Sequence, residues 1–159
     1  MTSNGAQSRR HVGSPRCVVA DDQPALYDVI SAYFSVWGID VVEVAGDGDE
    51  AVAAVEAHQP EALVLNLGLR GGDGLEVLAR CADASPRTGI VVYSECSDPS
   101  AMARAVRYGA RGFVSKEAPL DELARAVGAA AAGESYIDPR LNGVMLEAAA
   151  SARLEWGAA

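Results

Sequence analysis

The chain has 159 residues, half of them hydrophobic, and a formal net charge of -9 at pH 7. This length suits one domain with its own core, and no apolar run approaches the roughly eighteen residues of a membrane-spanning helix. We therefore expect no membrane insertion. DNA binding by these residues alone is also disfavoured, because it depends on clustered Lys and Arg.

Residues 1–15 are polar and lack the apolar centre of a signal peptide. We expect a disordered N-terminal tail there, with nothing that directs export. The three cysteines, Cys17, Cys81 and Cys96, are an odd number at unrelated spacings, and with two histidines they form no metal-ligand pattern. A reducing, cytoplasmic environment fits best.

From residue 16 onward, short β-branched runs alternate with longer stretches whose apolar residues recur at helical spacing. The short runs predict strands at residues 17–20, 39–44, 62–65, 90–93 and 112–114. Helices are expected between and after them, at residues 24–37, 48–58, 75–82, 98–109 and 119–133. Five strands, each followed by a helix, predict an α/β fold with an open, doubly wound parallel sheet.

Proline and glycine mark the expected helix ends. Pro24 can occupy the first position of a helix that stops at Gly38, and a later helix closes at Gly109. The first helix is expected to bury one stripe, made of Leu26, Ile30, Tyr33, Phe34 and Trp37. Gly128 weakens the prediction for the last turns of the fifth helix.

A sixth helix could begin at Asp138 and Pro139, although Gly143 weakens its first turn. Its apolar residues at helical spacing are Leu141, Met145, Ala148 and Ala152. Two interpretations stay open: a helix packed on its own domain or frayed as a linker, and a helix that binds a partner.

The polar residues collect where the predicted strands end. Strand one ends in Asp21 and Asp22, strand three in Asn66, strand four in Ser94, and strand five runs through Ser115 into Lys116. Singly, they could be a helix cap, a turn residue and a solvated charge. Ligands of open α/β sheets bind at the carboxyl ends of the strands, so together these residues predict a functional site.

Five stretches carry a family resemblance: VVADDQP, LVLNLGLRGGDGLEVL, IVVYSE, YGARGFVSKEAPLDELARAV and GESYIDPRL. With their spacing, they make residues 16–133 similar to a response-regulator receiver domain of the NarL/LuxR type. Asp22 precedes Asn66 by 44 positions, Ser94 follows after 28 more, and Lys116 after another 22. The resemblance implies a (βα)5, flavodoxin- or CheY-like fold, with residues 134–159 as a C-terminal helix or linker toward an output domain outside this chain.

The resemblance also implies an acidic pocket that holds Mg²⁺. Asp22 would bind the ion directly, Asp21 mainly through water, and the backbone carbonyl of Gly68 would be another ligand. Such an all-oxygen site that retains waters suits Mg²⁺.

Three further roles follow from the resemblance. Ser94 would be the switch hydroxyl that closes on a phosphoryl group, and Lys116 would be its charge partner. Phe113 would be the aromatic side chain that changes rotamer with Ser94, although its sequence context fits a plain core residue equally well.

Asn66 departs from the family, in which this position is the aspartate that accepts the phosphoryl group. An amide oxygen carries no charge and its lone pair is committed to resonance, so an aspartyl phosphate cannot form. The lost charge also weakens the expected Mg²⁺ site. Arg70 stands where the family usually has proline, and it either offers a cation near the rim or is a solvated arginine.

Three explanations of Asn66 stay open: a natural pseudo-receiver, an ordinary phosphorylatable receiver with an Asp-to-Asn change, and a local accident in a protein whose output lies elsewhere. In the family, residues 98–133 face protein partners or a second copy, while DNA is bound only by an output domain. A stand-alone binding module or an enzyme is the remaining alternative. Catalysis is not expected, since no glycine-rich phosphate loop follows strand one and no nucleophile stands beside a base.

Overall fold

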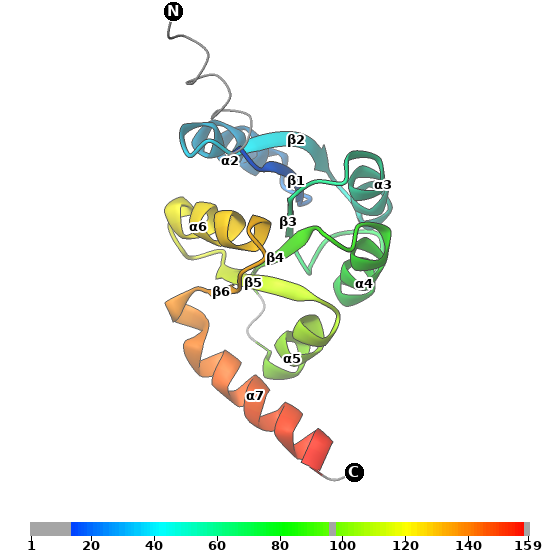
Figure 1. Cartoon of the computed structure of the whole chain (residues 1–159), viewed down its shortest axis with the longest axis vertical. Helices are drawn as coiled ribbons and strands as arrows, with labels where there is room; N and C mark the ends of the chain where they lie inside the picture. The colour runs from blue at the N-terminus through cyan, green and yellow to red at the C-terminus, as the bar shows by residue number, and fades with distance from the viewer. Residues whose placement is uncertain (1–13, 96–97, 158–159) are drawn as a thin grey trace, which may run out of the picture.

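A computed structural model of the chain describes residues 14–95 and 98–157 (Figure 1). The N-terminal tail predicted for residues 1–15 lies almost entirely outside the described residues, as does Cys96. The side chain of Ala152, one of the apolar residues at helical spacing in the last expected helix, also lies outside them.

Six strands form one sheet in the order β2-β1-β3-β4-β5-β6, and all neighbouring strands are parallel. The order 2-1-3-4-5, with β6 added at the edge next to β5, is the CheY-like receiver arrangement and confirms the predicted α/β fold. The strands are β1 (Arg16–Ala20), β2 (Asp40–Ala45), β3 (Ala62–Leu65), β4 (Gly89–Ser94), β5 (Ala110–Ser115) and β6 (Tyr136–Ile137).

The short strand β6 extends the sheet beyond the five predicted strands. Tyr136 and Ile137 pair with Gly112 and Phe113 of β5. Two residues are too few to show the period of a strand in a sequence. Its pairing with β5 defines β6 as a strand, and no pattern in residues 136 and 137 could have predicted it.

The helices occupy the predicted places with small shifts at their ends. They are α2 (Pro24–Val36), α3 (Gly48–His58), α4 (Gly74–Ala84), α5 (Pro99–Arg107), α6 (Leu120–Ala131), the 3-10 turn η1 (Pro139–Leu141) and α7 (Asn142–Gly157). Aspartate side chains cap α3, α4 and α5 by accepting hydrogen bonds from backbone N–H groups of the first turn. Gly128 does not interrupt α6, nor Gly143 α7.

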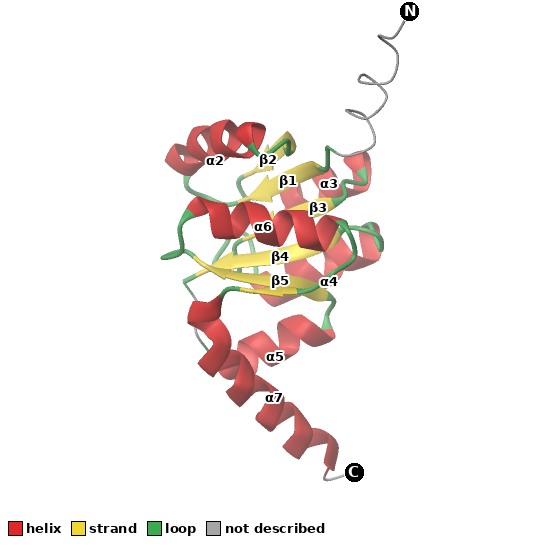
Figure 2. Cartoon of the chain, turned by 60° about the vertical axis from the view of Figure 1, so that its left-hand side comes forward, coloured by secondary structure: helices red, strands yellow, loops and turns green. Residues whose placement is uncertain are grey.

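Alternate residues of each central strand face opposite layers of helices, because successive side chains point to opposite faces of a sheet. Leu63 and Leu65 of β3 pack with α3, α4, α5 and α7, whereas Ala62 and Val64 pack with α2 and α6. The two helical layers enclose the sheet in Figures 1 and 2. Both faces of the sheet are therefore apolar, as the continuous runs predicted.

The expected buried stripe of α2 is correct at Ile30 and Phe34 but wrong at Trp37. Trp37 follows the last residue of the helix and is 43% exposed. Its ring lies 6.0 Å from the guanidinium carbon of Arg125 on α6. The helical period placed Trp37 on the inner face, but the helix ends before that position is reached.

Helix α7 packs against α5, which agrees with the expectation of a helix packed on its own domain. Leu141 of η1 and Ala148 of α7 are 7% and 2% exposed. Leu146, on the other side of α7, is 72% exposed. The helix thus buries one narrow stripe.

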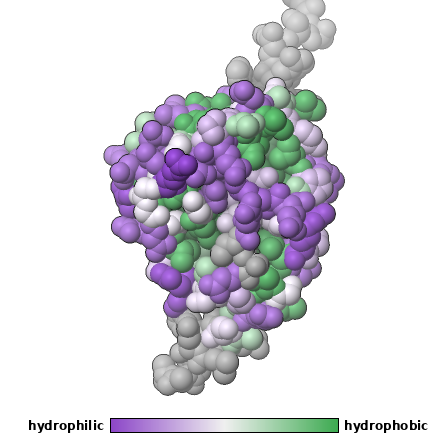
Figure 3. All heavy atoms as spheres, turned by 180° about the vertical axis from the view of Figure 1, so that it is seen from behind, coloured by the Kyte–Doolittle hydropathy of each residue, from purple (hydrophilic) through white to green (hydrophobic). Residues whose placement is uncertain are grey.

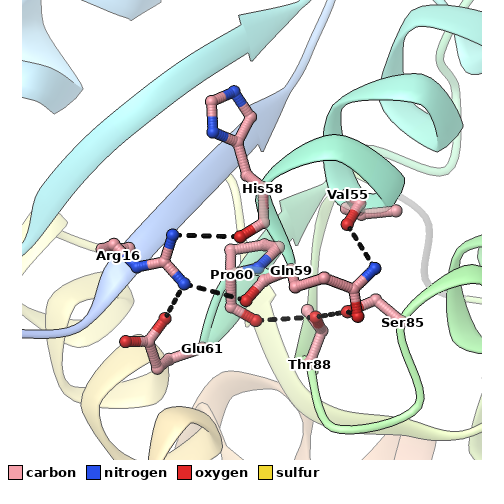
Figure 4. A network of polar contacts seen from close by, with 8 residues as sticks. All are labelled: Arg16, Val55, His58, Gln59, Pro60, Glu61, Ser85 and Thr88. Carbon is pink, nitrogen blue, oxygen red and sulfur yellow. Dashed lines mark hydrogen bonds and ion pairs between the residues drawn. The ribbon is translucent and has the colours of Figure 1, made fainter.

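Polar contacts close the amino ends of the strands (Figure 4). The Arg16 guanidinium donates to the backbone carbonyls of His58 and Gln59, at 3.0 Å in each case. The Thr88 hydroxyl donates to the carbonyl of Pro60 at 2.7 Å. These contacts hold the end of α3 and the loop before β4 against the sheet. They stabilise the fold at this edge, which we call the structural edge of the sheet.

Most of the face in Figure 3 is hydrophilic, with hydrophobic side chains in separate patches. Among the described residues, no helix is long and apolar enough to cross a membrane.

Candidate functional site

The carboxyl ends of β1, β3, β4 and β5 meet around one cavity of about 500 Å³. Asp22, Asn66, Ser94 and Lys116 all line it, as their places at the strand ends predicted. Gly68 lines the same cavity. Four segments far apart in the sequence therefore form one site, because parallel strands carry their carboxyl ends to a common edge.

Asp21 is buried and does not line the cavity, but its carboxylate holds the ammonium of Lys116, which does. The Lys116 Nζ atom lies 2.6 Å from Asp21 Oδ2, and the two side chains are 9% and 2% exposed. The other carboxylate oxygen, Oδ1, accepts a hydrogen bond from the backbone N–H of Gln23 at 3.1 Å. A buried carboxylate needs such partners, so Lys116 and the turn at Gln23 together keep Asp21 in place.

Two tyrosines that the sequence did not single out surround this ion pair. The Lys116 Nζ atom lies 5.5 Å from the ring centroid of Tyr93, which adds a cation–π contact. Burial raises the pKa of Tyr93, and the charge of Asp21 raises it further. The hydroxyl of Tyr27 donates to the backbone carbonyl of Asp21. The Asp21 segment is thus held from β4 and α2.

Asn66 directs its side-chain oxygen to its own loop. The Oδ1 atom accepts a hydrogen bond from the backbone N–H of Gly68 at 2.9 Å, which forms an Asx turn. The backbone N–H of Asn66 donates to the carbonyl of Ala20 at 3.0 Å. The amide oxygen therefore already has a donor within its own turn.

Arg70 is both a rim cation and a solvated side chain. Its Nε atom lies 3.5 Å from Asp22 Oδ2, while its side chain is 84% exposed. The residues that follow, Gly71 and Gly72, have φ values of +88° and +139°, which side-chain-bearing residues rarely adopt. The backbone carbonyl of Arg70 accepts from the N–H of Gly48 at 3.0 Å, so the loop is anchored to the start of α3.

Ser94 and Phe113 differ in their relation to the cavity. Ser94 is 6% exposed and ends β4 at the cavity, and its carbonyl accepts from the N–H of Lys116 at 3.3 Å. Phe113 is 2% exposed and belongs to the core on the side of α5 and α7. Its burial agrees with the core interpretation, and its role as a switch stays a prediction.

The side chains expected around Mg²⁺ already have partners within the chain. Asp21 is committed to Lys116, Asp22 is paired with Arg70, and Asn66 contributes an uncharged oxygen. Within residues 14–95 and 98–157, no three His, Cys, Asp or Glu side chains are grouped so that they could hold a metal ion. Mg²⁺ sites usually include one or two free carboxylates. Metal binding, including the role expected of the Gly68 carbonyl, stays a prediction.

Comparison with known proteins gives the family. Residues 17–128 match the response regulator receiver domain. The chain belongs to that family. A receiver is a signalling module rather than a catalytic enzyme.

The relatives of this receiver are regulators of the NarL/LuxR type. It is 31% identical over 128 residues to the oxygen regulatory protein NreC of Staphylococcus carnosus, a match that covers 79% of this chain and 59% of NreC. The NreC protein of Staphylococcus aureus strain JH9 is 30% identical over the same length. The receiver thus spans somewhat more than half the length of these relatives.

Solved structures of response regulators are similar to this receiver as well. The signal receiver domain of the response regulator NarL from Mycobacterium tuberculosis is 30% identical, with a TM-score of 0.71 over 76% of this chain and 98% of that one. A LuxR-family two-component response regulator from Aurantimonas sp. SI85-9A1 shares the fold at 24% identity, with a TM-score of 0.78 over 84% of this chain and 96% of that one. The receiver is therefore similar to NarL/LuxR-family receivers in sequence and in fold.

Proposed function

We propose that this receiver signals without an aspartyl phosphate and acts by binding a protein partner, a second copy of itself or a ligand. One observation carries the proposal: the side chain at position 66 of the cavity is a carboxamide whose oxygen accepts a hydrogen bond from Gly68. An ionised carboxylate oxygen can attack phosphorus, whereas an amide oxygen is a far weaker nucleophile.

The charges around the cavity support a resting state that needs no metal ion. Each aspartate of the acidic pair has a cation of the chain beside it, Lys116 at Asp21 and Arg70 at Asp22. A carboxylate at position 66 would add a third negative charge to this group. We propose that Mg²⁺ binds weakly here and that an acid at position 66 strengthens its binding.

The partner surface in this proposal is formed by α5, β5 and α6. On α6, Arg125 lies 3.9 Å from both Asp121 and Glu122, so its charge is largely balanced within the helix. A face of mixed charge suits a weak isologous dimer. Sedimentation at high concentration tests this, and a strict monomer for the whole chain contradicts it.

DNA binding, in this proposal, belongs to an output domain and not to these residues. A LuxR-family response regulator of Staphylococcus aureus that shares the fold, at 21% identity and a TM-score of 0.68, is a DNA-binding protein. The net charge of -9 disfavours contact between this receiver and phosphate backbones. We propose a cytoplasmic regulator in which the receiver controls such a domain.

An ordinary phosphorylatable receiver that carries an Asp-to-Asn change is the second candidate. Asp22, Ser94 and Lys116 line one cavity, and Asp21 is paired with Lys116. Their retention favours this candidate, since a disused pocket has no need of all four. Arg70 favours the first candidate, because its side chain forms an ion pair with Asp22, one of the two aspartates expected to hold Mg²⁺. The two candidates differ in how many changes separate the chain from phosphotransfer.

Exposure to acetyl phosphate, and separately to beryllofluoride with Mg²⁺, tests both candidates. The proteins to compare are the parent chain, Asn66→Asp, and Asn66→Asp with Arg70→Pro. Intact-mass measurement reports a phosphoryl adduct, and a change in intrinsic fluorescence reports beryllofluoride binding.

We expect no adduct on the parent chain. If Asn66→Asp alone forms the adduct and binds beryllofluoride, the chain is an ordinary receiver with one changed side chain. If both also require Arg70→Pro, the pocket has diverged further from that of an ordinary receiver. An acid-labile adduct on the parent chain, in stoichiometric yield, overturns the proposal.

A further inference from the structure

Asp138 is a fully buried acid that the site does not use. It lies between β6 and η1, and its exposed fraction is 0%. A buried carboxylate is costly unless hydrogen bonds replace its water. The partners of Asp138 therefore indicate what it holds together.

Those partners come from two different elements. On one side, Asp138 Oδ2 accepts from the backbone N–H of Ser115 at 3.1 Å, at the end of β5. On the other, Oδ1 accepts from the backbone N–H and from Nη1 of Arg140, both at 3.1 Å. The carboxylate thus joins the last residue of β5 to the turn that starts α7.

The joined strand end is part of the functional site. Ser115 directly precedes Lys116, whose ammonium holds Asp21 and whose N–H donates to Ser94. A second cavity of about 360 Å³ runs from Ser94 and Lys116 to Arg140, with Leu141 and Val144 beyond. A shift of the Lys116 backbone would therefore bear on the contact between Ser115 and Asp138, which caps η1.

We propose that Asp138 is a positioning residue that couples the Asn66 cavity to helix α7. A change at Lys116 moves the end of β5, and Asp138 passes that movement to η1 and to the first turns of α7. Helix α7 also packs on α5, which is part of the proposed partner surface, so the coupling carries the state of the cavity to that face. The inference rests on the proposed function only in taking this cavity as the signalling site.

Asp138→Asn is a selective test of this link because it keeps the shape of the side chain. Its oxygen can still accept from the N–H of residue 140, but its NH2 group then faces the N–H of Ser115. Two donors in contact cannot bond, so the side-chain link to Ser115 is lost. The backbone N–H of residue 138 keeps its bond to the carbonyl of Phe113, at 2.8 Å in the parent chain. Asp138→Ser gives an independent second variant, since serine retains a local turn but is too short to reach Ser115.

Asp98 provides a matched control. It too precedes a proline and caps its own turn, with Oδ1 accepting from the N–H of Ser100 at 3.1 Å. Asp98→Asn removes one charge from a turn of the same kind at the start of α5. It leaves the contact between Asp138 and Ser115 in place.

The experiment is hydrogen exchange of the amides at 142–148 in the whole chain. Lys116→Arg and Asn66→Asp each perturb the cavity, and each is combined with the parent, Asp138→Asn, Asp138→Ser and Asp98→Asn backgrounds. In the parent and Asp98→Asn backgrounds, we expect a cavity change to alter the exchange rate by about five-fold or more. In both Asp138 backgrounds, we expect the same change to alter it less than two-fold, or about 0.4 kcal/mol.

Two results overturn the proposal. One is that neither cavity variant alters exchange in α7 in the parent background. The other is that the effect is equally large without the Asp138 carboxylate, which would place the coupling elsewhere. Phosphoryl transfer does not enter the measurement, so failure here is distinct from failure of the proposed function, which the adduct assay reports.

Discussion

The ammonium of Lys116 lies 2.6 Å from the carboxylate of Asp21, and both side chains are nearly excluded from water. Desolvation makes each charge costly, and only the other charge and a few hydrogen bonds compensate it. In this receiver the lysine therefore stabilises the buried Asp21, at a cavity in which the side chain at position 66 carries no charge.

Replacement of Lys116 by Met should destabilise the chain by about 3 kcal/mol or more, because it leaves the buried Asp21 without its cation. Urea unfolding at neutral pH measures the change. The control is Arg80→Met, which breaks a surface pair between Arg80 and Asp49 with side chains 44% and 81% exposed. Its cost should be below about 1 kcal/mol. Equal costs for the two variants would show that burial of the Lys116 pair adds nothing.

Replacement of Arg70 by Gln should raise the affinity for Mg²⁺ a few-fold, since it removes the cation beside Asp22. The effect is limited because a solvated ion pair contributes only about 0.2–1 kcal/mol. Isothermal titration with MgCl2 in the Asn66→Asp background, where binding should be strong enough to follow, measures it.

Arg87→Gln is the control for Arg70→Gln. It removes the same charge from the loop before β4, at the structural edge of the sheet. A similar rise in Mg²⁺ affinity in both variants would assign the effect to net charge rather than to the contact between Arg70 and Asp22.

The sequence predicted the sheet and the composition of the site. Continuous apolar runs at 62–65 and 90–93 indicated central strands, and the strands proved to be buried on both faces. Because the strands are parallel, the residue after each strand had to lie at the same edge. The grouping of Asn66, Ser94 and Lys116 around one cavity thus followed from the apolar runs that mark the strands and from their parallel arrangement.

Contacts that depend on tertiary structure were not predictable in this way. The pairing of Asp21 with Lys116 joins residues 95 positions apart, and several rim groups could have been the lysine's partner. The Asp138-Pro139 step reads as an ordinary helix start, and nothing local shows that its carboxylate is buried against β5. Trp37 was misplaced because the period of a helix does not report where the helix ends.

Stability should fall as the pH rises above about 9, partly because of two buried thiols. Burial raises the pKa of Cys17 from 9.0 to about 12 and that of Cys81 from 9.0 to about 11. Between these values the unfolded chain loses thiol protons that the folded chain keeps, so the free energy of unfolding decreases with pH. The contribution of the two thiols to the free energy of unfolding is fully present below about pH 9 and is lost by about pH 12.

Urea unfolding at about pH 8 and about pH 10 measures this dependence, with a slope of up to about 1.4 kcal/mol per pH unit for each thiol. Tyr27 and Tyr93 also have raised pKa values and contribute in the same direction. Comparison with Cys17→Ala isolates one thiol, since this variant should be less stable at pH 8 but should show a shallower slope. An unchanged slope would mean that Cys17 ionises as readily in the folded chain as in the unfolded one.

Replacement of Gly74 by Ala should destabilise the chain by about 1–3 kcal/mol. Gly74 begins α4 behind the site loop, and a Cβ atom there would overlap the backbone carbonyl of Leu67, directly after Asn66. Backbone cannot rotate away as a side chain can, so the site loop must shift. The same variant should therefore alter the environment of Asn66, which amide chemical shifts of residues 66–69 report.

Gly128→Ala is the matched control, because a Cβ atom at Gly128 meets nothing within 4 Å. Gly128 lies inside α6, where alanine is favoured over glycine by roughly 0.5–1 kcal/mol. The two variants add the same methyl group to helical glycines, yet one should lower stability and the other raise it. If Gly74→Ala proved as stable as Gly128→Ala, the loop from Asn66 to Gly74 would have to be less tightly packed than the contact with Leu67 indicates.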